Sequence, residues 1–333
     1  MAEVSMYRSW LDDWDERKAL QGDQLKTSAP FALEANCCFQ GASNANSIAD
    51  FIRLAEITVT DPAFYDQEGE CDWKCDKQKG WISFPSGIHS DVDENNRVWA
   101  KISEAGPSRK ALIVFHHWNA KKRNRIISRF LSQRGITVVE IAMPYHMERQ
   151  RPGSTHADYM LSPNLGRTIQ SVRQAVWDGQ RLIRCLKKSG YDNISVLGIS
   201  LGSWVAGLIA AHDTAVSKAS LFLSAGSLAD MVWTGRATRS IRESLKYNIS
   251  LDELRKAWAP LNLENYARGL TRADLHLQLV LAMRDKVVLP ELSAKFVNVL
   301  RHAGGSPDVM ELNCGHYSLA LPPYSMVAGL TGC

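Results

Sequence analysis

The stretch Gly198-Ile199-Ser200-Leu201-Gly202 constrains this chain more than any other part of its sequence. A short β-branched apolar run, residues 193–197, comes before it, and residues 203–211 after it have the composition of a buried helix. A G-x-S-x-G sequence between a strand and a helix predicts a sharp turn that presents a serine nucleophile, a nucleophile elbow. The strained backbone at such a serine leaves no room for a side chain two residues before or after it, which explains both glycines.

The composition excludes several classes of protein. The 333 residues suffice for one large α/β domain or two smaller ones, and 45 % of them are hydrophobic, enough for a large core. With 39 Lys and Arg against 35 Asp and Glu, the net charge of +4 is too small to indicate a nucleic-acid partner. No apolar stretch reaches the roughly 18 residues of a membrane span, and the charged N-terminus lacks the apolar core of a secretory signal. We therefore expect no integral membrane segment and a cytoplasmic location.

The cysteines indicate neither a disulfide framework nor a metal site. They number seven: Cys37, Cys38, Cys71, Cys75, Cys185, Cys314 and Cys333. An odd number without a secretory signal favours reduced thiols. Cys71 and Cys75 are spaced C-x3-C, but the adjacent pair Cys37-Cys38 fits the spacing of zinc ligands poorly. We expect ordinary thiols, no metal and no organic cofactor.

Apolar runs along the chain predict a mostly parallel sheet. Residues 81–84 and 97–102 fit two antiparallel strands, because the second alternates polar and apolar residues. Further strands are expected at 111–115, 137–142, 193–197, 219–224, 277–283 and 308–312, with helices between them at 121–134, 167–188, 203–211 and 290–303. This alternation predicts an α/β fold with a doubly wound, mostly parallel sheet and an antiparallel N-terminal edge.

Two segments lie outside this alternation. Residues 1–80 predict a mostly helical N-terminal extension, which would pack beside the sheet, cover the site or form a homodimer. Residues 227–272 predict a helical insertion within the domain formed by residues 81–329. This insertion is either a solvated helical pair or a cap over the active site, since insertions at the carboxyl edge of a parallel sheet tend to shape pockets.

Two later residues supply what a serine nucleophile needs. A serine hydroxyl attacks only when a base takes its proton, and the base needs a carboxylate to hold its tautomer. His316 follows the last predicted strand and Asp285 follows the strand before it. Because the carboxyl ends of parallel strands meet at one edge of a sheet, we predict a triad of Ser200, Asp285 and His316.

The same edge is expected to hold the oxyanion donors and the substrate contacts. The donors are predicted to be the backbone N–H groups of Leu201 and of Trp118, the latter assigned to within one residue because its loop reads His116-His117-Trp118. The loop after residues 137–142 faces the same way, and its arginines are of a type that binds anionic groups. A solvated loop tied down by a salt bridge is the alternative. Candidate substrate contacts are His117, Tyr145, His146 and Arg149.

The chain order Ser200, Asp285, His316 resembles that of the α/β-hydrolase superfamily, and the resemblance covers about residues 81–329. The Pro144-Tyr145-His146 loop and the elbow are most similar to the α/β-hydrolase domain-containing 18 group and its bacterial relatives. Dienelactone-hydrolase-like and acyl-peptidase-like groups match more loosely, since a dienelactone hydrolase usually carries cysteine where this chain has Ser200. The resemblance implies the α/β-hydrolase fold and acyl transfer to water.

The favoured hypothesis is a serine-dependent carboxylic-ester hydrolase that cleaves a small-molecule ester through an acyl-enzyme. The same triad serves amidases, thioesterases, peptidases and acyltransferases. A non-catalytic binding protein on a hydrolase scaffold is the alternative from a different class.

Overall fold

One nine-stranded sheet organises the molecule, in the order β1-β2-β3-β5-β4-β6-β7-β8-β9. The structure is a computed structural model that describes residues 2–26, 29–39, 41–42, 45–66, 73–76, 79–123 and 125–325. The strands are β1 (Lys74–Asp76), β2 (Trp81–Pro85), β3 (Arg97–Ser103), β4 (Lys110–Phe115), β5 (Thr137–Ile141), β6 (Asn193–Ile199), β7 (Val216–Phe222), β8 (His276–Ala282) and β9 (Asp308–Leu312). From β5 to β9 the neighbours are parallel, whereas β1, β2 and β3 add an antiparallel edge. The predicted mostly parallel sheet with an antiparallel N-terminal edge is confirmed.

The sheet is covered on both faces. Along β4, Ile113 and Phe115 belong to one buried apolar cluster and Leu112 belongs to another. Alternate residues of a strand point to opposite faces, so a strand that is apolar throughout needs cover on both sides. The cover comes from α3 (Arg125–Ser132), α4 (Leu165–Lys188), α5 (Leu201–His212) and α10 (Pro290–His302).

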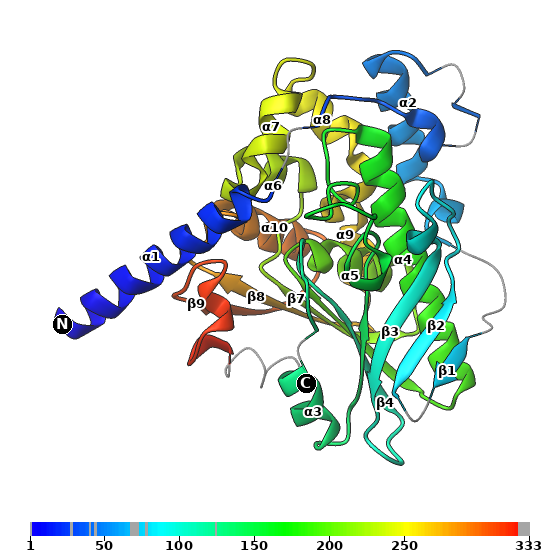
Figure 1. Cartoon of the computed structure of the whole chain (residues 1–333), viewed down its shortest axis with the longest axis vertical. Coiled ribbons are helices and arrows are strands. Elements are labelled where there is room, and N and C mark those ends of the chain that lie inside the picture. Colours follow the sequence, from blue (N-terminus) through cyan, green and yellow to red (C-terminus); the bar gives the residue numbers. More distant parts are fainter. Residues whose placement is uncertain are drawn as a thin grey trace.

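Helices fill the chain between β7 and β8, where the sequence predicts an insertion. They are α6 (Leu228–Thr234), α7 (Arg239–Leu245), α8 (Leu251–Ala257) and α9 (Ala267–Leu270). Ser250 and Glu253 form a capping box that starts α8. In Figure 1, α6, α7 and α8 lie together at the top of the molecule, with α2 (Ile48–Val59) beside α8.

The N-terminal extension is not helical throughout. The N-terminus of α1 (Ala2–Asp23) lies at the outer edge of the molecule in Figure 1, and the helix contacts the body from Tyr7 onward. β1 also belongs to this extension and pairs with β2, with Cys75 opposite Ile82. The sequence did not indicate β1, because its three residues carry no apolar pattern and their pairing comes from β2.

The structure shows the state of several cysteines and bears on the expectations about metals and membranes. Cys37, Cys38 and Cys314 are free thiols, but Cys185 is disulfide-bonded, so the expectation of reduced thiols is wrong there. Sequence spacing could not show which sulfurs the fold brings together. Cys71, Cys333 and residues 326–329 lie outside the described residues. Within the described part of the chain, no His, Cys, Asp and Glu side chains gather in a group that would hold a metal, and no helix is both long and apolar enough to cross a bilayer.

Candidate active site

Ser200 occupies a strained turn between β6 and α5. Its backbone has φ 53° and ψ −123°, a combination that costs a residue with a side chain on the order of 1–3 kcal/mol. The surrounding structure holds this conformation: the Ser200 N–H donates to the Phe222 carbonyl of β7 at 2.9 Å, and the Ser203 N–H donates to the Ser200 carbonyl at 2.7 Å. Such strain is typical of functional positions, and it matches the turn that the motif predicts.

The two glycines of the motif allow three backbone segments to meet at Ser200. A Cβ atom on Gly198 would collide with the backbone of Gly202. A Cβ atom on Gly202 would collide with the carbonyl oxygens of Phe115 and His116. The loop after β4 therefore runs directly against the first turn of α5, next to Ser200.

His316 and Asp285 form a hydrogen-bonded pair at the carboxyl ends of β9 and β8. The His316 Nδ1 lies 2.7 Å from the Asp285 Oδ2, and both side chains are largely buried, with 9 % and 1 % of their surface exposed. The other carboxylate oxygen, Oδ1, accepts hydrogen bonds from the N–H groups of Val287 and Val288 at 2.7 and 2.9 Å. These bonds fix the carboxylate, so the proton sits on His316 Nδ1 and Nε2 is left as the basic nitrogen.

The loop after β4 offers N–H groups beside the helix that starts at Leu201. The first N–H groups of a helix have no acceptor within it. Among the described residues, the N–H groups of Leu201, His117 and Trp118 have no hydrogen-bond partner, whereas the Asn119 N–H donates to the His146 Nε2 at 2.9 Å. The free donors are of the kind expected of an oxyanion hole, and the N–H groups of His117 and Trp118 are both candidates for the second donor.

The histidines of this region are held neutral. His116 accepts a hydrogen bond from the Met143 N–H at Nε2, so its Nδ1 donates to the His117 carbonyl. Burial lowers the pKa of His116 well below its usual range. The His117 side chain reaches solvent, yet the protein around its ring lowers its pKa by desolvation, and nearby His316 contributes a smaller lowering.

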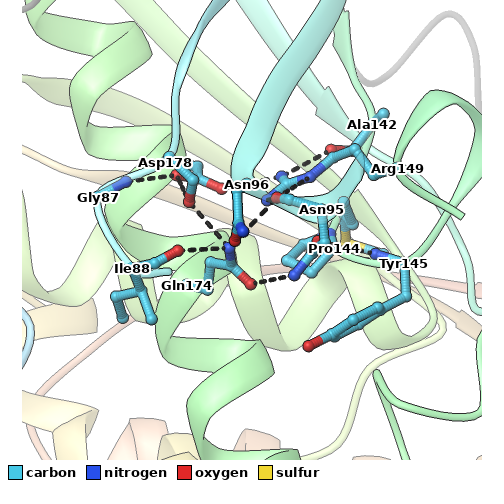
Figure 2. Close-up of polar contacts among 12 residues, drawn as sticks. Gly87, Ile88, Asn95, Asn96, Ala142, Pro144, Tyr145, Arg149, Gln174 and Asp178 are labelled. Atoms are coloured by element: carbon cyan, nitrogen blue, oxygen red, sulfur yellow. Dashed lines mark hydrogen bonds and ion pairs between the residues drawn. The ribbon is translucent and has the colours of Figure 1, made fainter. Parts of the chain in front are cut away.

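Arg149 does not reach a substrate. Its side chain is fully buried, and its guanidinium lies 2.8 Å from the equally buried carboxylate of Asp178 in α4. The remaining donors bond the carbonyl oxygens of Asn95 and Ala142, as Figure 2 shows. We therefore correct the prediction of a substrate contact, because the side chain is fully buried and each of its three guanidinium nitrogens bonds a protein group.

Tyr145 and His146 are also buried rather than presented to a substrate. The Tyr145 N–H donates to the Asn95 Oδ1 at 3.1 Å, and Asn95 in turn bonds Gln174 of α4 (Figure 2). The His146 Nδ1 donates to the Pro144 carbonyl at 2.8 Å. Of the four predicted substrate contacts, His117 alone has an exposed side chain.

Asp178, Asn95 and Gln174 had not been predicted to support the site. Asp178 could have been predicted to form a buried ion pair or hydrogen bond, because a carboxylate among the apolar residues of a helix such as 165–188 requires a buried partner. Which arginine supplies that partner depends on how the loop after β5 folds, and the sequence pattern does not contain this information.

Comparisons with known proteins agree on the architecture. No protein-family model matches the chain, and no curated protein matches its sequence. Acetyl xylan esterase 1 from Thermoanaerobacterium sp. JW/SL YS485 aligns over 92 % of this chain and 95 % of its own, with a TM-score of 0.58 and 14 % identity. The Pyrococcus furiosus esterase Pf2001 aligns over 79 % and 91 %, with a TM-score of 0.53 and 16 % identity.

Peptidases share the same architecture. The Pyrococcus horikoshii acylaminoacyl peptidase aligns over 79 % of this chain with a TM-score of 0.56 and 9 % identity. The chain covers 40 % of that peptidase and 35 % of a Mycobacterium tuberculosis puromycin-hydrolyzing peptidase, less than half of either. These likenesses show that the chain has the α/β-hydrolase fold, as the resemblance implied.

Removing the Arg149 guanidinium is expected to destabilise the protein strongly. In Arg149→Met, Asp178 stays buried without its cation, which costs about 3–5 kcal/mol. The free energy of unfolding in urea measures this loss. Arg109→Met is the matched control, since the Arg109–Asp192 pair is exposed (68 % and 59 %) and is worth about 1 kcal/mol or less. Equal losses in the two variants would contradict a structural role for Arg149.

His146 is expected to make the folded protein sensitive to acid. Burial lowers its pKa from 6.5 to about 3. The unfolded chain therefore binds a proton at His146 below pH 6.5 while the folded protein does not, and the free energy of unfolding falls as the pH drops from 6.5 toward 3. Urea unfolding measured between pH 3 and pH 6.5 gives the free energy of unfolding as a function of pH. In His146→Gln the slope of this plot is expected to be shallower than in the unaltered protein by up to about 1.4 kcal/mol per pH unit. Parallel slopes would show that His146 is protonated in the folded state.

Proposed function

We propose that this protein is a serine hydrolase that cleaves a small carboxylic ester through an acyl-enzyme intermediate. The observation that carries the proposal is the His316–Asp285 pair at 2.7 Å, which follows β9 and β8 at the same sheet edge as the strained Ser200 after β6. A neutral imidazole oriented by a carboxylate is the base that a serine hydroxyl requires.

In the proposed mechanism, Ser200 Oγ attacks the acyl carbonyl while His316 Nε2 takes its proton. Asp285 holds the imidazole in this tautomer and stabilises the imidazolium that forms. The N–H groups of Leu201 and of Trp118 or His117 bind the oxyanion of the tetrahedral intermediate. His316 then returns the proton to the leaving alcohol, and a water molecule that it activates hydrolyses the acyl-enzyme. No step of this sequence calls for a metal or an organic cofactor.

The proposal also specifies the bond that is cleaved, a carboxylic ester with a compact acyl group. Esterases are among the structures that share the fold, and so are peptidases. Ser200 is only 7 % exposed, which favours a compact acyl group. The elbow and the Pro144-Tyr145-His146 loop support a place in the α/β-hydrolase domain-containing 18 group, and we keep that assignment as a prediction.

The triad is tested by substitution and covalent labelling. Ser200→Ala, His316→Ala and Asp285→Asn are each expected to lower kcat for p-nitrophenyl acetate by about 10⁴-fold or more while leaving the circular dichroism spectrum unchanged. Asp274→Asn is the control, because Asp274 is an exposed carboxylate ahead of β8, at the opposite end of that strand. Near-normal turnover in Ser200→Ala, or no labelling of Ser200 by a fluorophosphonate, would overturn the mechanism and favour a binding protein.

The leaving group is tested on the unaltered protein. We expect kcat/KM to be highest for an acetyl ester, lower for the matching thioester and lowest for the matching anilide, measured by release of the chromogenic product. A thioester or anilide hydrolysed faster than the ester would move the assignment to a thioesterase or an amidase.

A further inference from the structure

The N-terminal helix α1 is bonded to the loop that carries His316. The Asp15 Oδ1 accepts hydrogen bonds from the N–H groups of Tyr317 and Ser318 at 2.6 and 3.0 Å. The Asp15 Oδ2 accepts one from the Ser318 hydroxyl at 2.6 Å, and that hydroxyl accepts one from the Gly315 N–H at 2.8 Å. The backbone is thus fixed on both sides of His316 by one carboxylate that lies about 300 positions earlier in the chain.

The contact between the helix and this loop is close. A Cβ atom on Gly315 would collide with the Asp15 carboxylate, so the helix packs directly against the residue that precedes His316. Glycine is the residue that permits this approach. Asp15 itself bonds the backbone and a hydroxyl rather than the imidazole.

The same helix is bonded to the loop that carries Asp285. Arg284 forms an ion pair with Asp12, and its guanidinium donates to the Arg8 carbonyl at 2.8 Å. The Arg284 N–H donates to the Cys314 carbonyl at 3.0 Å, which joins the two loops to each other. α1 therefore bonds both loops whose side chains form the 2.7 Å pair of His316 and Asp285.

The inserted helices hold the other side of α1. Arg236, between α6 and α7, forms ion pairs with Glu16 and Asp23. Beyond the helix, Lys26 donates to the Ala237 carbonyl and lies over the ring of Trp118, 5.4 Å from its centre. α1 is therefore held from Arg8 to its C-terminal end, by the loops that carry Asp285 and His316 and by the inserted helices.

We propose that Asp15 is a positioning residue for the reaction and that α1 is a working part of the active site. This inference rests on the proposed function, because it assigns to Asp15 the placement of the His316 base. A displacement of about 1 Å in a catalytic group costs up to about a hundredfold in rate, and the bonds of Asp15 restrain the backbone on both sides of His316. Asp15 acts through the backbone on either side of His316, so its loss affects the chemical step rather than substrate binding.

The first test separates kcat from KM. In Asp15→Ala we expect kcat for p-nitrophenyl acetate to fall about 10- to 100-fold while KM stays within about threefold. Asp13→Ala is the matched control, since Asp13 is exposed on the same helix, and it is expected to match the unaltered protein. Asp15→Asn keeps one carbonyl oxygen for the two backbone N–H groups, so its kcat is expected to lie between that of Asp15→Ala and that of the unaltered protein. This variant keeps the proposal testable if Asp15→Ala does not fold.

The second test asks whether Asp15 acts through His316. In a His316→Ala background, Asp15→Ala is expected to cause no further loss of the residual activity, since a residue that only places the imidazole has nothing left to place. The rate at which a fluorophosphonate labels Ser200 is expected to fall in Asp15→Ala by the same factor as kcat.

The outcomes distinguish the two proposals. Full activity in Asp15→Ala, together with loss of activity in His316→Ala, would overturn the role of Asp15 and leave the hydrolase intact. A further loss from Asp15→Ala in the His316→Ala background would overturn it as well, because Asp15 would then act by another route. Full activity in His316→Ala would instead overturn the hydrolase mechanism itself.

Discussion

The buried ion pair between Arg149 and Asp178 is the interaction on which the rest of the site depends. A guanidinium and a carboxylate removed from water are tolerated only when their hydrogen bonds are made. The carbonyl oxygens of Asn95 and Ala142 accept from Arg149, and the Ser86 hydroxyl and the Gly87 N–H donate to Asp178. Burial raises the pKa of Asp178, while Arg149 favours its ionised form. The pair ties the loop after β5 to α4 (Figure 2).

That loop in turn holds the one beside Ser200. The His146 Nε2 accepts from the Asn119 N–H, and the Met143 N–H donates to the His116 Nε2. Two neutral imidazoles therefore connect the loop after β5 to the segment that we propose supplies an oxyanion donor. Donors that stabilise a charge must be aimed before it forms, so this support matters more to the proposed chemistry than a direct substrate contact from Arg149 would.

Those parts of the proposed site that depend on chain position could be predicted from the sequence. Ser200, Asp285 and His316 each follow an apolar run, and parallel strands bring their carboxyl ends to one edge, where the structure pairs His316 with Asp285 at 2.7 Å. Side-chain direction in an irregular loop has no period, so the sequence pattern that makes Arg149 a candidate substrate contact cannot show that it is fully buried. The three-residue β1 was missed because its partner, not its own composition, makes it a strand.

Asp15 could not be predicted from the sequence either, because its partners lie about 300 positions later in the chain. Nothing in a polar helix near the N-terminus distinguishes the carboxylate that will accept from the Tyr317 and Ser318 N–H groups. Arg236 joins the same helix to the inserted helices, so α1 is bonded both to those helices and to the loop that carries His316. In the proposed mechanism the strained Ser200 reacts only with an imidazole beside its hydroxyl, so the bonds between α1 and the His316 loop bear directly on the reaction.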